Sequence, residues 1–396
     1  MGDPLFSHGV TLAVVLIVLL KVVVAFAVLL VSVLMVIWFE RKLISDMQNR
    51  IGPNRAGPFG LLQSLADGIK LFFKEDLLPA KAERRVFRLA PYLSAVPAFL
   101  SFVIVPVGGS ITIAHHRTYL QVADPPVGIL FLLAMSSVSV YGVMLAGWSS
   151  GSKYPLLGSV RASAQMISYE AAMGLSIASV VLVSHTLTTS GIVASQHDNW
   201  WNIVRTIFVP FFVFLVAVTA ELNRPPFDLV EAEQELVGGY MTEYSSVRFA
   251  LFYLAEFMNM ITMSAIVVTL FLGGPDGPAP HVVRWLWPIL WFAAKTVAFV
   301  FCYVWARAAL PRLRYDQLMN LGWRYLIPGS LWWLLVVAAR QISAAWAFAV
   351  FGAGLVAAGV LAWVVRLARA HPAGPATVPA EASGAPGLQP VSGKGA

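Results

Sequence analysis

Apolar residues gather into nine long runs along this chain, and polar segments separate the runs. A helix needs about 20 apolar residues to cross the hydrocarbon core of a bilayer. The runs that reach or approach this length are 11–38, 90–107, 127–147, 165–184, 201–221, 247–272, 284–306, 318–339 and 343–365. The pattern therefore predicts an all-α fold, a polytopic membrane bundle of about nine tilted transmembrane helices.

Two positions interrupt this regular pattern. Arg340 and Gln341 alone divide the last two runs, so one very long tilted helix is the alternative to two spans. Lys21 lies inside the first run, where we expect it to snorkel or face neighbouring helices, with a proton relay as the alternative. No Lys or Arg precedes this run, so we expect a span and not a cleavable signal peptide.

Composition supports a membrane protein and excludes several kinds of site. Hydrophobic residues make up 58% of the 396 residues and charged residues 12%, about half the charged share of soluble domains. Cys302 is the single cysteine, and no histidine pair lies within the spans. We therefore expect no metal, haem, flavin or iron–sulfur cluster held by this chain alone.

The positive charges predict the orientation in the membrane. With the N-terminus outside, 21 Lys and Arg residues fall in cytoplasmic segments, 4 fall in outer segments, and Lys21 and Lys295 lie within spans. Cytoplasmic loops carry such an excess of Lys and Arg. The net charge of +7 thus reflects topology and does not indicate nucleic acid binding. We expect a transmembrane bundle over residues 1–370 and a disordered cytoplasmic tail, rich in Pro, Ala and Gly, over 371–396.

The first predicted cytoplasmic segment combines a rigid loop with an amphipathic helix. Gly52-Pro53 and Gly57-Pro58 fix a non-helical stretch. Residues 59–75 then repeat apolar positions at helical spacing, which predicts a helix lying in the membrane interface. This helix is either a surface connector with a solvated charged stripe or the roof of a cavity entered from the bilayer.

Acidic residues are concentrated between positions 221 and 256. Seven of the 20 acids lie there: Glu221, Asp228, Glu231, Glu233, Glu235, Glu243 and Glu256. Crowded carboxylates raise one another's pKa values. An ordinary solvated loop is the alternative, but apolar residues between the acids and the Gly238-Gly239 pair favour a folded segment with a hinge.

Two carboxylates lie within the predicted spans themselves, Glu170 in the fourth run and Glu256 in the sixth. An ionised carboxylate costs roughly 3 kcal/mol in hydrocarbon, so such residues are by default proton or ion sites. A hydrogen-bonded, permanently neutral acid is the alternative for each. Together with Glu221, they predict a line of titratable groups from the cytoplasmic side toward mid-membrane.

Three ordered motifs give the chain a family resemblance. The first comprises Glu40-Arg41-Lys42, Gln48-Asn49-Arg50, Gly52-Pro53-Asn54-Arg55-Ala56-Gly57-Pro58 and Ala66-Asp67-Gly68-Ile69-Lys70. The second runs from Glu221-Leu222-Asn223-Arg224-Pro225-Pro226 to Glu243-Tyr244, and the third includes Pro311-Arg312 and Arg314-Tyr315-Asp316. Over about residues 10–340 the sequence resembles the H-type membrane subunit of respiratory complex I, the proton-pumping NADH:quinone oxidoreductase, which is called subunit 1 in mitochondria.

This resemblance implies a site and a set of partners in the bacterial plasma membrane. It implies a subunit that binds quinone as substrate, contacts lipid, and joins the iron–sulfur and quinone-site subunits of the hydrophilic arm to the antiporter-like pump subunits. The residues that would line or support the quinone tunnel and the arm interface are Glu40, Arg41, Arg50, Arg55, Asp67, Lys70, Asp228, Glu231, Glu233 and Glu235. The proton path would begin at Glu170, Glu221, Glu243 and Glu256. The chain itself would carry no catalytic residue or redox centre, and its ninth span exceeds the family's eight-helix core.

Three other functions remain open from the sequence. Membrane-bound hydrogenases and ferredoxin or deazaflavin dehydrogenases use a similar subunit. A secondary ion transporter would bind its ion at Glu170 and Glu256, although no inverted repeat is apparent. A membrane anchor without chemistry would leave the buried acids unexplained.

Overall fold

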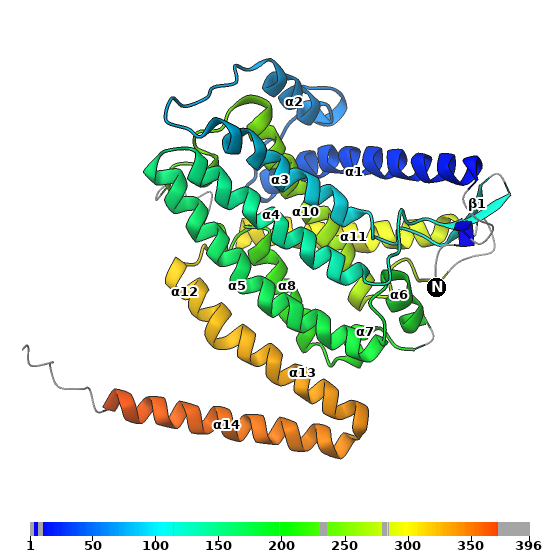
Figure 1. Cartoon of the computed structure of the whole chain (residues 1–396), viewed down its shortest axis with the longest axis vertical. Coiled ribbons are helices and arrows are strands. Elements are labelled where there is room, and N and C mark those ends of the chain that lie inside the picture. Colours follow the sequence, from blue (N-terminus) through cyan, green and yellow to red (C-terminus); the bar gives the residue numbers. More distant parts are fainter. Residues whose placement is uncertain are drawn as a thin grey trace, which may run out of the picture.

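Every predicted apolar run contains a helix in the computed structural model, which describes residues 4–6, 11–113, 115–197, 199–229, 236–278, 283 and 285–370 (Figure 1). The main helices are α1 (Leu12–Met47), α3 (Arg84–Phe102), α4 (Gly128–Ser149), α5 (Lys153–Ser184), α8 (Val209–Glu221), α10 (Ser246–Phe271), α11 (Leu286–Ala309), α13 (Ile327–Ile342) and α14 (Ala344–Ala370). Seven helical segments are long and apolar enough to span a membrane. The other two candidates are α8, with only 13 residues, and α3, which begins with arginines and contains Pro91 and Pro97.

Shorter elements connect these helices. They are η1 (Pro4–Phe6), η2 (Pro58–Gly60), α2 (Gln63–Phe73), β1 (Ser110–Ile113), β2 (His116–Tyr119), α6 (Thr189–His197), α7 (Asn202–Arg205), η3 (Gly239–Met241), α12 (Tyr315–Asn320) and η4 (Leu321–Leu326, a π-helix). The two strands form an antiparallel hairpin with Ser110 opposite Tyr119. The apolar pattern did not predict this hairpin, because strands of four residues carry little periodicity.

The core lies around α10, against which α1, α3, α5, α8 and α11 pack (Figure 1). Most of the α10 span is buried, whereas none of the α14 span is buried. Aromatic rings fill the centre, as where Phe271 meets Phe211 at 5.5 Å and Phe214 at 5.6 Å between ring centroids. Since α10 is central and mostly buried, it contacts residues from several neighbouring helices at once.

The structure corrects several predicted boundaries. The fifth run is two helices, α7 and α8, because Ile207 and Phe208 adopt positive φ between them. The helix predicted over residues 59–75 corresponds to α2, which covers only Gln63–Phe73. Arg340 and Gln341 still belong to α13, and the break falls at Ser343, whose extended backbone makes α14 a separate helix. The alternative of one long terminal helix is therefore wrong.

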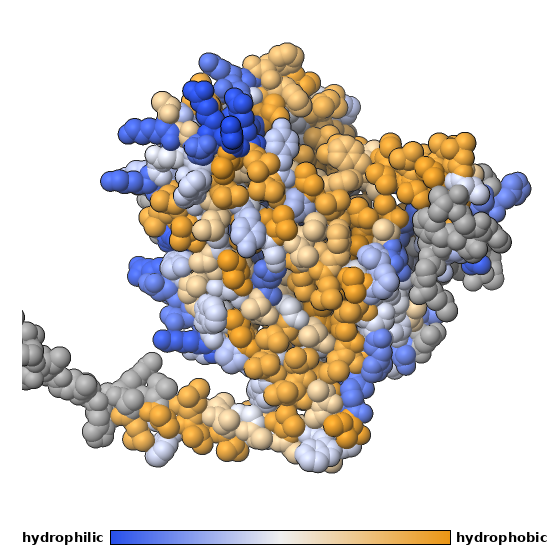
Figure 2. Space-filling model, viewed as in Figure 1, coloured by the Kyte–Doolittle hydropathy of each residue, from blue (hydrophilic) through white to orange (hydrophobic). Residues whose placement is uncertain are grey.

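Polar and apolar surfaces separate along the bundle. Hydrophilic residues gather at the edge where α3 and α5 begin (left in Figure 2), and a broad hydrophobic band follows. Many large apolar side chains of α1 and α14 are exposed, among them Leu12, Val23, Phe348 and Val356. A band of this kind suits a lipid environment, and the chain is a multi-pass membrane protein. The predicted tail 371–396 lies outside the described residues.

The fold predicts that Gly147 sets the separation of α4 and α5. A Cβ there would overlap the Pro155 carbonyl and the Ser159 side chain, whereas Gly174 of α5 has no such neighbour. We expect Gly147→Ala to cost about 1–3 kcal/mol through overpacking. The melting temperature of the purified assembly measures the cost. Gly174→Ala is the control, because it adds the same methyl group without a clash, and an equal effect of both substitutions would contradict the prediction.

Candidate functional site

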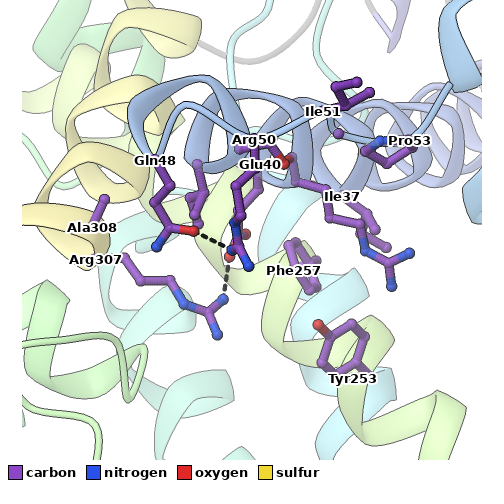
Figure 3. A pocket seen from close by; sticks show the side chains of 14 residues that line it. Ile37, Glu40, Gln48, Arg50, Ile51, Pro53, Tyr253, Phe257, Arg307 and Ala308 are labelled. Carbon is purple, nitrogen blue, oxygen red and sulfur yellow. Dashed lines mark hydrogen bonds and ion pairs between the residues drawn. The ribbon is translucent and has the colours of Figure 1, made fainter.

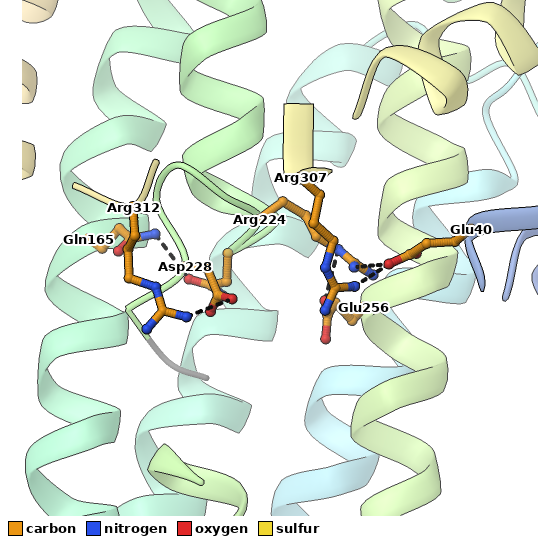
Figure 4. A network of polar contacts seen from close by, with 8 residues as sticks. Glu40, Gln165, Arg224, Asp228, Glu256, Arg307 and Arg312 are labelled. Atoms are coloured by element: carbon orange, nitrogen blue, oxygen red, sulfur yellow. Dashed lines mark hydrogen bonds and ion pairs between the residues drawn. The ribbon is translucent and has the colours of Figure 1, made fainter. Parts of the chain in front are cut away.

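A buried ion network joins four separate segments of the chain (Figure 4). Arg224, in the turn after α8, lies with Nη1 3.1 Å from Glu40 Oε1 of α1 and with Nε 3.0 Å from Glu256 Oε1 of α10. Arg307 of α11 forms a close ion pair with the same Glu40 oxygen. We call Glu40, Arg224, Glu256 and Arg307 the buried ion network.

The environment of Arg224 explains why these charges are tolerated inside the bundle. Its side chain is only 4% exposed, and its guanidinium lies 4.7 Å from the centroid of the Phe257 ring. An isolated buried charge costs several kcal/mol, and opposite charges with good geometry offset that cost. The planar guanidinium can contact two carboxylates at once, which the compact ammonium of lysine does less well.

The turn that carries Arg224 is fixed from both sides (Figure 4). The Gln165 side-chain amide donates to the carbonyl oxygens of Ala220 and Phe227 at 2.7 and 2.9 Å. The buried Asp228 carboxylate lies 3.5 Å from Arg312. The turn therefore presents Arg224 to the network at a defined position.

Two adjacent serines of α4 bind two different carboxylates. Ser136 donates a hydrogen bond to Glu221, and Ser137 donates to Glu170 of α5. Within the described part of the chain, the second Glu221 oxygen and the Ser94 hydroxyl have no hydrogen-bond partner. Both residues line a cavity of about 40 Å³ that also reaches Glu256, and a polar cavity of this size has room for ordered water.

A larger pocket of about 730 Å³ opens beside the buried ion network (Figure 3). We call it the Glu40 pocket. Its polar wall contains Glu40, Arg41, Arg50 and Arg307, and its apolar wall contains Ile37, Ile44, Tyr253 and Phe257. The second half of α1, the loop that follows it, α10 and α11 build these walls. The pocket can therefore hold a molecule that has both a polar and an apolar part.

The amphipathic helix α2 is tied to the rim of this pocket. Asp67 of α2 pairs with Arg41 at 2.5 Å, and Trp38 of α1 donates to the Phe59 carbonyl at 3.0 Å. Phe72 and Phe73 of α2 are 72% and 88% exposed. The predicted apolar face of this helix is thus not covered by the rest of the described chain.

The structure sorts the predicted site residues into groups. Glu40 and Glu256 meet in the buried ion network, while Glu170 and Glu221 meet at the two serines. Arg41, Arg50 and Asp67 lie at or near the Glu40 pocket, and Arg55 and Lys70 are exposed. Glu243 is half-buried between η3 and α10. Glu231, Glu233 and Glu235 lie outside the described residues.

Tyr244, the residue after Glu243, connects the end of the acidic segment 221–243 to α3. Its hydroxyl donates to the Phe87 carbonyl at 3.2 Å, and its ring stacks on the Phe87 ring at 4.0 Å between centroids. Burial raises the pKa of Tyr244 to about 12, so the hydroxyl keeps its proton and remains a donor near neutral pH.

Sequence reasoning did not assign roles to Arg224, Arg307, Ser136 and Ser137. The available signal for Arg224 was a basic residue three positions after Glu221, the acid that ends a span. The serines gave no signal, because hydroxyls in membrane helices often bond to their own backbone. Among the described residues, no three or more His, Cys, Asp or Glu side chains are grouped to hold a metal ion.

Known proteins share this sequence over most of its length. The NADH dehydrogenase family model matches residues 20–338. The H subunit of NADH-quinone oxidoreductase from Frankia casuarinae is 54% identical over 330 residues, which cover 82% of this chain and 73% of the relative. This chain belongs to the family of NADH-quinone oxidoreductase H subunits. The H subunit from Frankia alni is also 54% identical with the same coverage, and that from Streptomyces avermitilis is 51% identical over 81% of this chain and 72% of the relative.

Family membership decides between the functions left open by the sequence. The chain is a membrane subunit of NADH-quinone oxidoreductase, and the resemblance is confirmed. Its identity with these H subunits favours this complex over the hydrogenase-like relatives and over a free-standing ion transporter.

The buried ion network predicts a large difference between two arginines. We expect Arg224→Gln to destabilise the assembly by about 3–5 kcal/mol, because it leaves the buried Glu40 and the half-buried Glu256 without their shared partner. Arg41→Gln removes a largely exposed pair and should cost no more than about 1 kcal/mol. Melting temperatures of the purified complexes, with subunit levels in membranes, test this. Equal decreases in melting temperature from both substitutions would show that the burial of Arg224 does not make its ion pairs more stabilising than the exposed pair of Arg41.

Proposed function

We propose that this chain forms the membrane-side wall of the quinone access tunnel in NADH-quinone oxidoreductase. The observation that carries the proposal is the Glu40 pocket, which combines an apolar wall with arginine and glutamate side chains. Quinone needs both kinds of surface, because its ring carbonyls accept hydrogen bonds and its tail is apolar. Arg55, Asp67, Lys70, Asp228, Glu231, Glu233 and Glu235 line or support the tunnel and the contact with the hydrophilic arm.

The same proposal places the start of a proton path in this chain. The cavity between Glu256 and Glu221 supports it, as do the Ser136 and Ser137 contacts to Glu221 and Glu170. A serine hydroxyl donates one proton and accepts others, so it can relay a proton between neighbouring groups. Glu243 lies at the cytoplasmic entrance of this path.

The coupling mechanism follows from charge balance. Reduction of a quinone by two electrons requires two protons and creates transient negative charge. A negative charge in the Glu40 pocket repels Glu40 and attracts Arg307, which also contacts Glu40. Because Arg224 forms ion pairs with both Glu40 and Glu256, a change at Glu40 alters the partner of Glu256. The disturbance then passes to Glu221, Glu170 and the antiporter-like subunits.

The orientation and partners belong to this proposal. The charge distribution supports an outer N-terminus and a cytoplasmic C-terminus in a bacterial plasma membrane. Exposed apolar faces of α1, α2 and α14 would be covered by lipid and by neighbouring subunits. Residues 1–370 would form the bundle, and 371–396 a disordered tail.

The tunnel proposal predicts that filling the Glu40 pocket slows quinone reduction. Ala308 lines the pocket, while its neighbour Ala309 is exposed and is not among the lining residues. We expect Ala308→Trp to lower kcat/KM for quinone about tenfold, a loss of about 1.4 kcal/mol. Ala309→Trp is the matched control. Unchanged quinone kinetics in an assembled Ala308→Trp complex would remove the pocket from the tunnel.

The proton path predicts a loss of pumping from two conservative substitutions. Glu221→Gln and Glu170→Gln retain shape and hydrogen bonding but cannot carry a proton. We expect both quinone turnover and proton pumping to fall about tenfold, with the complex still assembled. Reconstituted vesicles with a pH-sensitive dye provide the measurement, and exposed Glu83→Gln is the control. If both activities stay intact, these carboxylates have only a structural role.

A further inference from the structure

Two small polar cavities lie side by side at Glu221, inside the helix bundle. The first, of about 40 Å³, reaches Glu256, and the second, of about 10 Å³, reaches Ser136. The residues that line both cavities are Ser139, Met166, Glu221 and Asn259. The wall between the two cavities is therefore mostly polar, and the amide of Asn259 belongs to it.

Asn259 lies about one helical turn from the buried ion network. It follows Glu256 by three positions on α10, and residues three apart share one face of a helix. The helices α3 and α8, which carry Ser94 and Glu221, pack against α10. The half-buried Asn259 lines the first cavity together with Glu256, Ser94 and Glu221. One face of α10 thus brings both Glu256 and Asn259 to the cavity that contains Glu221.

Two buried polar atoms indicate what this cavity binds. The Ser94 hydroxyl and the second Glu221 oxygen have no hydrogen-bond partner within the described part of the chain, and Ser94 is only 3% exposed. Buried polar groups are normally paired with protein or with ordered water, because an unpaired group is costly. The first cavity has the volume and the polar partners that a water molecule requires. Water is therefore the ligand that fits it.

The side-chain amide of Asn259 suits the binding of a water molecule that relays protons. An amide both donates and accepts hydrogen bonds, whereas an ionised carboxylate only accepts. It carries no charge and does not titrate, so it can orient a water molecule without taking its proton. Serine hydroxyls, such as that of Ser139 in the same wall, also donate and accept.

We propose that Asn259 holds ordered water between Glu256 and Glu221 and so acts as a positioning residue of the proton path. A proton released by one carboxylic acid joins the water, and a different proton of the same water passes to the other carboxylate. The water is regenerated, and Asn259 neither gains nor loses a proton. This inference rests on the proposed proton path and names the residue that links two of its acids.

A cryo-EM map of the whole purified complex, in which ordered water is resolved, tests the placement. We expect at least one water in the first cavity, about 2.7–3.2 Å from the Asn259 amide and from the Ser94 hydroxyl or the second Glu221 oxygen. Direct contact between Asn259 and Glu221, with no water in the first cavity, would overturn the proposal. The map decides the placement whether or not a variant complex assembles.

Replacement of the amide tests its effect on turnover. Asn259→Leu keeps the size of the side chain but removes its donor and acceptor. We expect kcat for quinone reduction and the rate of proton pumping to fall about tenfold. The KM for quinone should stay unchanged, because Asn259 does not line the Glu40 pocket. The ratio of the rates in H₂O and D₂O should rise, since proton transfer then limits turnover, and a packing defect alone would not raise it.

Two further variants control for packing. Asn259→Ser retains a hydroxyl and leaves room for another water, so it should restore most of the turnover. Thr262→Val removes a buried hydroxyl from the same helix, and Thr262 lines neither cavity. Thr262→Val should change neither kcat nor the ratio of rates in H₂O and D₂O.

The comparison with Glu221→Gln separates this inference from the proton path itself. If Glu221→Gln is inactive while Asn259→Leu retains full turnover and pumping, Asn259 has no role in the path, and the path itself remains supported. If both variants retain full activity, the proton path is wrong, and the role of Asn259 is wrong with it.

Discussion

The interaction on which the rest of the site depends is the pairing of the buried Arg224 with the Glu40 and Glu256 carboxylates. Without Arg224, Glu40 and Glu256 would lie inside the bundle with one partner fewer, at a cost of several kcal/mol. The pairing requires α1, α10, α11 and the turn after α8 to meet at one point. The arrangement of four segments and the position of the Glu40 pocket thus follow from one electrostatic constraint.

The two groups of carboxylates are held by different chemistry. Arginines hold Glu40 and Glu256 in the buried ion network, whereas serine hydroxyls hold Glu170 and Glu221. Ion pairs involve the full charge of both partners, whereas a serine hydroxyl offers a neutral hydrogen bond. The proposed path thus begins at ion-paired carboxylates beside the Glu40 pocket and continues to carboxylates that accept hydrogen bonds from hydroxyls.

The exposed apolar surfaces show where the chain meets its surroundings. The α14 helix contacts the rest of the chain through α13, where the Trp332 ring stacks on Phe351 at 5.2 Å between centroids. A side chain at Gly354 would overlap Trp332, so this contact is close. Beyond it, α14, the outer face of α1 and the aromatic side of α2 need lipid or other subunits to cover them.

The sequence by itself determined the helical membrane class, the nine apolar runs and the motifs of the family, because long apolar runs and ordered motifs are local properties. It also placed Glu170 and Glu256 within helical spans, where α5 and α10 carry them. It could not show that Glu40 meets Arg224, 184 residues away, or that Ser136 and Ser137 bind Glu221 and Glu170. It missed the short hairpin and the break between α7 and α8. Those features depend on contacts between distant segments, and only the packing of the helices decides which buried charges become partners.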